Sequence, residues 1–333
     1  MSFTFGIYPS GDTGAEADGT PMATPDEPER IAQALRDLQG GDRPFRVRAY
    51  RSFAETGTTL SYRTMGKPTT ADNLWVSLVA PERYATEGRS LDLVLAYQEE
   101  SGRLDAWLEF IRATVRESGA HISSLQICEE PNVDNPILDG SMPNVLQALV
   151  EGVIAAKDEA LKAGHSGLQV GFNAAVSLDP DDAFWKGLGA LADERFHGAL
   201  DYVGFDCFPD VFMPVPMAEL TERVEGLLTF FRGTSLTALA GIDPAVPLRI
   251  AENGWATGPG RPEERQAEVI ETVVRTVYGQ RDALTIDGYC LYALRDADSS
   301  SDDKFHRFGI MRDDYTPRPA FDTYRRLVAE LTV

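Results

Sequence analysis

Short apolar runs alternate with longer amphipathic segments along the whole chain, and this alternation constrains the fold more than any other feature. Eight runs are predicted to be strands, at 3–8, 45–50, 91–97, 122–128, 168–174, 200–205, 248–251 and 286–291. The segments between most of them, such as 104–118 and 145–163, repeat apolar residues at helical spacing. Strands that alternate with helices form parallel sheets through right-handed crossovers.

Eight such units in 333 residues match the usual size of a closed α/β barrel, the (β/α)8 or TIM barrel. We therefore predict a single (β/α)8 barrel domain over residues 1–333. An open, doubly wound sheet is the competing fold. That fold usually carries G-x-G-x-x-G after its first strand, whereas this chain has GIYPSGDTG there.

The segment 72–88 is the least regular part of the pattern. It fits either an irregular helix broken near Pro81 or a strand over 74–79. We prefer the helix, because LDLVLAY at 91–97 then supplies the third strand of the barrel. The loops at 9–24, 51–71 and 131–142 are expected to shape the rim.

Acidic residues dominate the charge balance. Asp and Glu number 52 and Lys and Arg number 31, so the formal net charge is −21. Such a surface repels phosphate backbones and anionic lipids, which argues against nucleic-acid and membrane partners. The sequence holds no apolar run long enough to span a membrane. The acidic surface favours a neutral or cationic small partner.

The cysteines and the first residues bear on the compartment. Cys128, Cys207 and Cys290 are far apart, odd in number and embedded in apolar runs, as expected for buried free thiols in a reducing compartment. No basic residue precedes Arg30, so a secretory signal is not indicated. The expected location is the cytoplasm. No metal-binding or phosphate-binding motif occurs, and we predict no cofactor.

Two predicted strands end in carboxylates. The fourth ends in QICEEPN, which contains Glu129 and Glu130, and the seventh ends in RIAENGW, which contains Glu252. Active sites of (β/α)8 barrels lie at the C-terminal ends of the strands, and the fourth and seventh strands face each other across the mouth. Two opposed carboxylates are what glycoside hydrolysis requires.

At this point the sequence resembles the clan-A glycoside hydrolases, the group of retaining TIM-barrel glycosidases. IAENG is similar to the ITENG-like segment of that group, and EEPN to its Asn-Glu-Pro. GYCLYALRDAD and FGIMRDDYTPRPAFDTYRRL are similar to the group's final strand and C-terminal segment. The resemblance runs in order along nearly the whole chain and implies a retaining glycosidase. The expected substrates are β-glycosides.

Carried over by position, the resemblance implies that Glu130 is the acid/base and Glu252 the nucleophile. Retaining chemistry implies carboxyl groups about 5–5.5 Å apart. An arginine near the end of the second strand contacts the nucleophile in this group. Arg48 is the better match and Arg46 the alternative, and a cation there would lower the pKa of Glu252.

The chain departs from the group at two positions. Glu129 stands where the group has an Asn that reaches the sugar 2-hydroxyl. A carboxylate there would suit a hydroxyl donor or a cationic amino group and would tend to raise the pKa of Glu130, unless strand alternation turns it outward. Tyr292 stands where the group has a tryptophan, which keeps an aromatic platform for the first sugar.

Three further residues at predicted strand ends complete the expected substrate-binding set: Asn173, Asp206 and Trp255. The expected partner is a carbohydrate or glycoside. Two other functions stay open at this stage. One is a catalytically silent carbohydrate-binding barrel, favoured by Glu129 in place of Asn. The other is a transglycosylase that uses the same site. The oligomeric state is not predicted.

Overall fold

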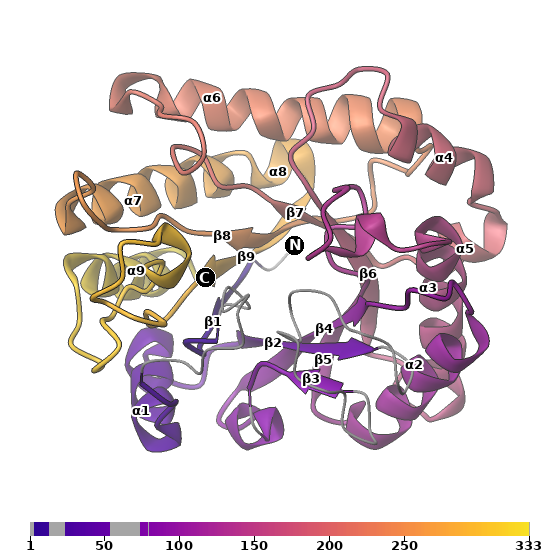
Figure 1. Cartoon of the computed structure of the whole chain (residues 1–333), viewed down its shortest axis with the longest axis horizontal. Coiled ribbons are helices and arrows are strands. Elements are labelled where there is room, and N and C mark those ends of the chain that lie inside the picture. The colour runs from indigo at the N-terminus through magenta and orange to yellow at the C-terminus, as the bar shows by residue number, and fades with distance from the viewer. Residues whose placement is uncertain (1–2, 13–23, 54–73, 79, 333) are drawn as a thin grey trace.

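Eight parallel strands follow one another around a closed barrel, with helices outside it, in the computed structural model of the chain (Figure 1). The structure describes residues 3–12, 24–53, 74–78 and 80–332. The barrel strands are β1 (Thr4–Tyr8), β2 (Phe45–Phe53), β4 (Arg89–Tyr97), β5 (Ile122–Ile127), β6 (Gln169–Ala175), β7 (Tyr202–Asp206), β8 (Leu248–Asn253) and β9 (Ile286–Tyr292). The predicted (β/α)8 barrel is therefore confirmed.

The α-helices follow the strands in the expected order. They are α1 (Pro28–Gln39), α2 (Asp105–Ser118), α3 (Val145–Lys162), α4 (Ala183–Leu191), α5 (Glu194–Ala199), α6 (Met217–Phe230), α7 (Glu263–Gly279), α8 (Arg281–Leu284) and α9 (Pro319–Leu331). The segment predicted as one helix near 183–192 is followed by a second short helix, α5. A π-helical stretch, Phe231–Leu239, extends α6.

The first strand closes the barrel. Phe5 of β1 lies opposite Phe45 of β2 on one side and opposite Tyr289 of β9 on the other. Both pairings are parallel, so the carboxyl ends of all eight strands meet at one end of the barrel. The residues that leave the strands at that end are therefore brought together.

The expected helix over 72–88 is wrong. The described part of this segment contains a short strand, β3 (Leu74–Val76), and a 3-10 helix at Pro81–Tyr84. β3 pairs antiparallel with the last residues of β2, where Phe53 lies opposite Leu74. The pairing partner comes from outside the segment, which is why local periodicity did not reveal it. Most of the predicted rim loops, at 13–23 and 54–71, lies outside the described residues.

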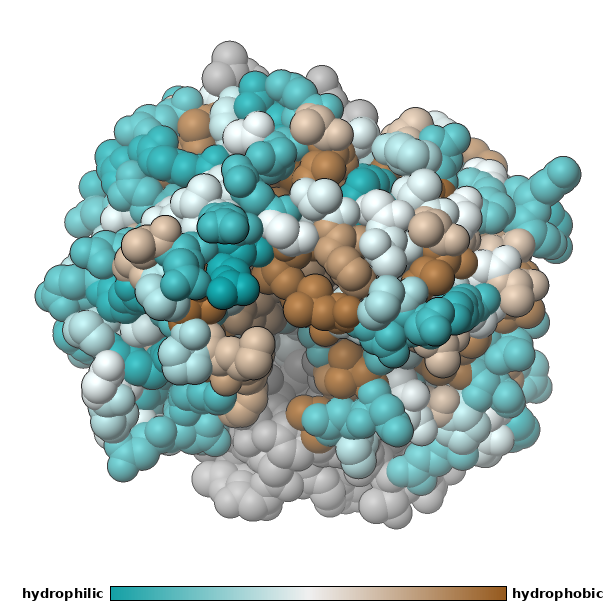
Figure 2. All heavy atoms as spheres, turned by 90° about the horizontal axis from the view of Figure 1, so that it is seen from above, coloured by the Kyte–Doolittle hydropathy of each residue, from teal (hydrophilic) through white to brown (hydrophobic). Residues whose placement is uncertain are grey.

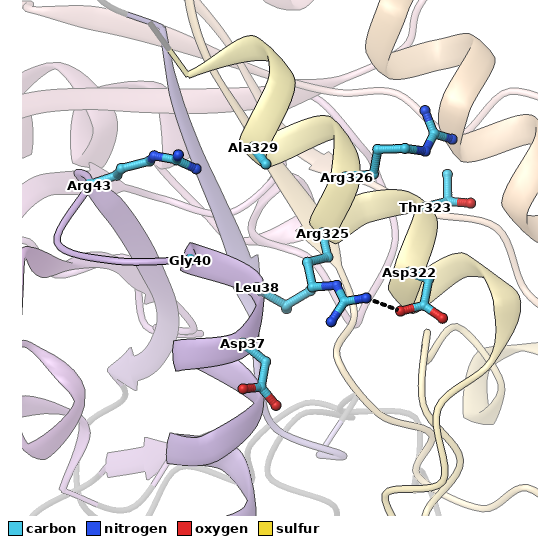
Figure 3. Close-up of a pocket in the computed structure, with 9 residues that line it drawn as sticks. All are labelled: Asp37, Leu38, Gly40, Arg43, Asp322, Thr323, Arg325, Arg326 and Ala329. Atoms are coloured by element: carbon cyan, nitrogen blue, oxygen red, sulfur yellow. Dashed lines mark hydrogen bonds and ion pairs between the residues drawn. The ribbon is translucent and has the colours of Figure 1, made fainter.

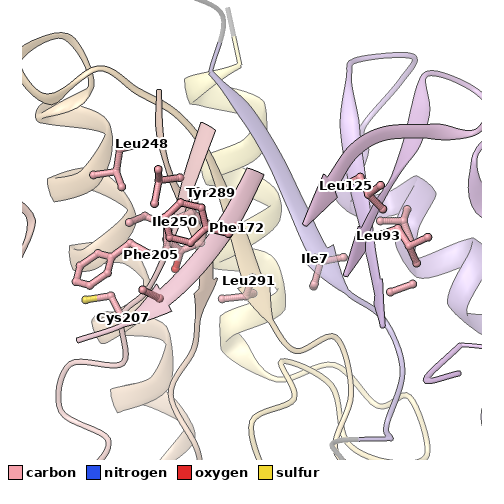
Figure 4. Close-up of a cluster of buried hydrophobic side chains, with 14 of the residues drawn as sticks. Ile7, Leu93, Leu125, Phe172, Phe205, Cys207, Leu248, Ile250, Tyr289 and Leu291 are labelled. Atoms are coloured by element: carbon pink, nitrogen blue, oxygen red, sulfur yellow. The ribbon is translucent and has the colours of Figure 1, made fainter. Parts of the chain in front are cut away.

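Strand alternation separates an apolar outer layer from a polar interior. On β4, Leu91, Leu93 and Leu95 belong to the hydrophobic cluster that the barrel shares with its helices, whereas Asp92 belongs to the buried polar set. Figure 4 shows this cluster on strands from both sides of the barrel. The core of the protein thus lies between strands and helices, which leaves the barrel interior for charged and hydrogen-bonding groups.

Hydrophilic residues prevail on the face shown in Figure 2, and hydrophobic residues gather around a hollow in its middle. The three cysteines are free and buried, as predicted. Burial raises the pKa of the Cys207 thiol to about 12, so this thiol is held in its neutral form at neutral pH. No helix in the described part of the chain is long and apolar enough to cross a membrane.

Candidate active site

A buried polar cluster occupies the C-terminal end of the barrel. Its central member is Arg48, on β2, which is 1% exposed. The guanidinium contacts five polar side chains, one from its own strand and four from other parts of the barrel wall. They are Tyr50 at 2.7 Å, Asp92 at 2.8 Å, Gln126 at 2.9 Å, Glu252 at 3.3 Å and Glu129 at 3.8 Å. One arginine therefore ties β2 to β4, β5 and β8.

Arg48 stays charged in this setting. Burial alone would lower its pKa, but the Tyr50 hydroxyl and the carboxylates of Asp92 and Glu252 raise it well above its ordinary value. The alternative candidate, Arg46, lies near Gln169, with its Nη2 at 3.5 Å from the amide oxygen. Of the two arginines that the sequence suggested, Arg48 is therefore the one in contact with Glu252.

Glu252 is held at one carboxylate oxygen by two donors. Its Oε1 accepts hydrogen bonds from Arg48 Nη2 and from the Tyr50 hydroxyl. Burial raises the pKa of Tyr50 well above its ordinary value, so the phenol keeps its proton and acts as a donor. These two contacts fix the orientation of the Glu252 carboxylate at the end of β8.

Glu129 faces the cluster and is 1% exposed. Its Oε2 accepts hydrogen bonds from Gln126 Nε2 at 2.8 Å and from Asn173 Nδ2 at 3.2 Å. Its backbone amide donates to the carboxylate of the buried Asp139 at 2.7 Å. The outward orientation that strand alternation allowed is thus excluded.

Glu130 lies at a tightly constrained turn after β5. Its φ is 44° and that of Cys128 is 65°, both in the left-handed region that non-glycine residues rarely adopt. The Glu130 amide donates to Asn173 Oδ1 at 2.8 Å. Two hydrogen bonds between Asn132 and Ala175 fasten the same turn to β6. Such strained residues persist where the surroundings over-determine them, often at functional sites.

Asp206 completes a group of three buried acids. Carboxylate oxygens of Glu129, Asp206 and Glu252 all lie within 4.8 Å of one another. Asp206 Oδ2 accepts from Asn173 Nδ2, while its Oδ1 has no hydrogen-bond partner among the described residues. Burial, followed by the charges of Glu252, Glu129 and Glu130, raises the pKa of Asp206 well above its ordinary value. A neutral Asp206 can donate a hydrogen bond from Oδ1.

Asp206→Asn should change how stability depends on pH. The native carboxyl keeps a proton that the unfolded chain releases above about pH 4, so wild-type stability falls as the pH rises from there through the raised pKa. The amide lacks this penalty. We expect the melting temperature of Asp206→Asn to drop less than that of wild type between about pH 4.5 and pH 7.5. Parallel melting curves at both pH values would mean that Asp206 is ionised.

The same three acids are the only group of His, Cys, Asp or Glu side chains within metal-binding reach among the described residues. Arg48 already lies against two of them, with Nη2 at 3.3 Å from Glu252 and 3.8 Å from Glu129. Its guanidinium supplies positive charge where a bound cation would have to sit. The residues therefore fit a metal ion poorly.

Tyr292 and Tyr8 form an aromatic wall beside the acids. Their rings stack at 5.3 Å with an interplanar angle of 5°, and Tyr8 meets Tyr50 edge-on at 5.1 Å. Gly254 of the ENGW segment lets the chain after β8 pass close to the backbone of Tyr292, because a Cβ at this position would lie 1.7 Å from the Tyr292 carbonyl oxygen. The half-buried Tyr292 is thus suitably placed for the platform that the sequence suggested.

Trp255 lies elsewhere. It is 3% exposed, its indole N–H donates to Asp210 at 3.0 Å, and Arg261 covers its ring at 3.8 Å from the centroid. These contacts make it a support for the loop after β7 rather than a stacking surface for a sugar. We therefore remove Trp255 from the expected substrate-binding set.

A groove of about 560 Å³ lies away from the carboxylates, on the outside of the barrel. Figure 3 shows it between the end of α1, with Asp37 and Leu38, and α9, where Arg325 pairs with Asp322 at 2.7 Å. Its lining comes from α1, the turn after α1 and α9, and none of it belongs to the cluster around Arg48. It is not the candidate site.

Sequence reasoning missed four members of the site. Tyr50, Asp92, Gln126 and Asp139 are buried and hydrogen-bonded to its other residues. Strand alternation could have indicated Tyr50 and Asp92. Tyr50 lies two positions after Arg48 and so on the same face of β2, and Asp92 lies opposite Arg48 on β4. Asp139 lies in a loop, where no periodicity points to it.

Solved structures similar in fold to this chain include three glycosidases. The Bifidobacterium dentium β-glucuronidase complexed with coumarin-3-O-glucuronide has 12% identity and a TM-score of 0.57, with 98% of this chain and 46% of that chain covered. A β-glucosidase from Thermotoga maritima in complex with noeuromycin has 10% identity and a TM-score of 0.59, with 98% and 94% covered. An apo β-glucosidase, 1317, has 15% identity and a TM-score of 0.58, with 97% and 96% covered.

Because all three sequence identities are low, these structural likenesses show the fold alone. The chain spans about half the length of the glucuronidases that it resembles. The sequence matches no protein-family model and no curated protein.

Proposed function

We propose that this chain is a retaining glycoside hydrolase that acts on β-glycosides without a cofactor. The observation that carries the proposal is the setting of Glu252. Its carboxylate lies at the C-terminal end of β8, oriented by Arg48 and the Tyr50 hydroxyl, with the Glu129–Glu130 pair following β5. A fixed anionic oxygen opposite a second carboxyl group is the arrangement that double displacement needs.

In the first step, Glu252 attacks the anomeric carbon, and the bond to the leaving oxygen breaks. Glu130 transfers its proton to that oxygen, so the aglycone departs as a neutral alcohol. In the second step, Glu130 takes a proton from water, and the water oxygen displaces Glu252. The sugar leaves with the anomeric configuration of the substrate, and both carboxyl groups return to their starting protonation states.

Arg48 and Tyr50 serve Glu252 in both steps. Their hydrogen bonds to Oε1 hold the carboxylate in one orientation and leave Oε2 for the attack. Glu129 and Asn173, which are linked at 3.2 Å, and Asp206 face the same space and are proposed to bind sugar hydroxyls. Tyr292 provides the aromatic platform.

The names of the structural neighbours support a β-glycoside as the first substrate class to test. They are β-glucuronidases and β-glucosidases, and one of them is complexed with an aryl glucuronide. Low identity does not carry their individual substrates over to this chain. A panel of aryl β-glycosides that differ only in the sugar is therefore the direct experiment.

Glu130→Ala should show the signature of a missing acid/base. Without a proton donor, substrates with a poor leaving group should slow by roughly 10²–10⁴-fold, whereas dinitrophenyl glycosides, which leave without protonation, should form the glycosyl-enzyme at a nearly normal rate. Added azide should restore turnover and yield a glycosyl azide of unchanged configuration. Rates are followed by release of the phenol.

The matched control is Glu129→Ala, which removes the neighbouring carboxylate. If Glu129→Ala, and not Glu130→Ala, shows the leaving-group dependence and azide rescue, the proton donor is Glu129. Sugar binding with no turnover of any aryl glycoside would favour a silent binding barrel. Transfer to an added acceptor in preference to water, detected by product analysis, would favour a transglycosylase.

A further inference from the structure

Four phenylalanine rings connect Tyr292, at the site, to the surface. Tyr292 meets Phe208 at 6.3 Å, Phe208 meets Phe212 at 6.3 Å, and Phe212 meets Phe305 at 6.1 Å. Phe308 joins the patch through Tyr292 at 5.6 Å and Phe305 at 6.4 Å. We call Phe208, Phe212, Phe305 and Phe308, together with Met213, the aromatic patch.

The outer end of the aromatic patch is open to solvent. Phe212 is 57% exposed, Met213 74% and Phe305 41%. They come from two loops, after β7 and after β9, and are three of the seven large hydrophobic residues that are exposed in the described part of the chain. Two separate loops thus converge their exposed apolar side chains at one place on a protein of net charge −21.

The inner end of the aromatic patch reaches the carboxylates. Tyr292 stacks on Tyr8, Tyr8 packs against Tyr50, and the Tyr50 hydroxyl donates to Glu252. Tyr8 and Tyr50 at the inner end are 1% and 3% exposed, whereas Phe212 at the outer end is 57% exposed. A group attached to a sugar on Tyr292 would meet these rings as it leaves the site.

Hydrogen bonds to Asp210 hold the loop that carries Phe212 and Met213 in place. Asp210 accepts hydrogen bonds from the Val215 amide at 2.7 Å, from Arg265 at 2.8 Å and from Trp255 at 3.0 Å. On the second loop, the Asp303 carboxylate caps the Phe305 amide at 2.9 Å. Side chains on supported loops lose little conformational freedom when a ligand binds, which favours a preformed binding surface.

The chemistry of the aromatic patch selects its ligand. Phe side chains have no hydrogen-bonding groups and Met has only a weak acceptor, so sugar hydroxyls would lose water there and gain little in return. A flat aromatic group loses no hydrogen bonds and gains ring contacts. Lys304 lies against the patch, with Nζ at 4.5 Å from the Phe212 centroid and 5.6 Å from that of Phe305.

We infer that the aromatic patch is a subsite for an aryl aglycone, so that the substrates are aryl glycosides. This inference rests on the proposed glycosidase function. It assigns the exposed Phe212 and Phe305 a role in specificity, separate from the carboxylates that carry out the reaction.

The test compares Phe212→Ser, Phe305→Ser and the double variant with wild type on two substrates that share one sugar. One is a para-nitrophenyl glycoside, and the other is the glycosyl fluoride, which has no aglycone. Each substitution should lower kcat/KM for the aryl glycoside by roughly tenfold through KM, and leave the fluoride unchanged. Leu161→Ser, on α3 and 56% exposed, is the matched control and should change neither substrate.

A second measurement needs no turnover. Saturation-transfer NMR with methylumbelliferone should show contact with wild type and with Leu161→Ser, and lose it in the double variant. Equal kcat/KM losses on both substrates, or unchanged values on both, would overturn the subsite while leaving the glycosidase in place. If no glycoside or fluoride is turned over, the glycosidase proposal fails and the NMR result alone decides about the subsite.

Two other occupants are outcomes of the same experiments. If the double variant loses activity on an oligosaccharide but not on the aryl glycoside, the aromatic patch binds a further sugar, and the inference is overturned. A dimeric wild type that becomes monomeric in the double variant, with unchanged substrate preference, would overturn it in favour of an interface between two copies.

Discussion

Replacement of Glu252 by alanine should lower kcat on an aryl β-glycoside by on the order of 10⁵-fold, because the covalent step loses its nucleophile. The structure supports a large effect, since both donors that orient Glu252, Arg48 and Tyr50, would remain, so the substitution removes the attacking oxygen and leaves its donors in place. Formate or azide should fit the vacated space and restore part of the rate. Azide should yield a glycosyl azide of inverted configuration.

Inverted product is the informative readout, because a general loss of folding cannot produce it. Glu252→Gln serves as the isosteric control and should be inactive without rescue, since the amide fills the space. Full activity in Glu252→Gln and Glu130→Gln together would rule out the assignment. Melting temperatures near that of wild type are needed to compare the variants.

Arg48→Met should remove about 3–5 kcal/mol from the free energy of unfolding and also abolish activity. The substitution leaves Asp92, Glu129 and Glu252 buried together without the cation that they share. Burial alone would raise the pKa of Asp92, and the guanidinium groups of Arg48 and Arg249 instead hold it below its usual range. Without Arg48, protonation of these acids should make stability rise again at lower pH. Urea unfolding at two pH values measures both effects.

Arg249→Met is the matched control for Arg48→Met. Arg249 is 1% exposed and binds Asp287 through two hydrogen bonds of 2.9 and 2.7 Å, away from Glu252. Its loss should destabilise the barrel comparably but leave kcat of the folded fraction nearly unchanged. If Arg48→Met retains wild-type stability, or if both variants lose kcat equally, Arg48 has no special part in the site.

The barrel could be predicted because the local periodicity of the sequence indicates its strands and helices. Each of the eight strands buries one face under a helix, so runs such as LDLVLAY keep an alternating or continuous apolar pattern that survives without knowledge of neighbours. The strand alternative at β3 was not preferred for the opposite reason. Three residues carry no period, and their strand conformation depends on pairing with the end of β2.

The placement of Glu129, Glu130 and Glu252 at the ends of two strands could be predicted, because each follows or ends an apolar run. The orientation of Glu129 could not, because it depends on hydrogen bonds from Gln126 and Asn173 on two different strands. Trp255 illustrates the limit in the other direction. The sequence placed it in the expected substrate-binding set, but its N–H group donates to Asp210 and the Arg261 guanidinium covers its ring.

The closure of β1 on β9 has a consequence for synthesis of the protein. The Tyr324 hydroxyl donates to the Gly6 carbonyl at 2.6 Å, across 318 positions of sequence. During synthesis β1 therefore lacks its second neighbour until β9 has been made, and until then strand edges stay unpaired and open to other chains. The sheet is open up to that point, and pairing of β9 with β1 is the event that closes the barrel.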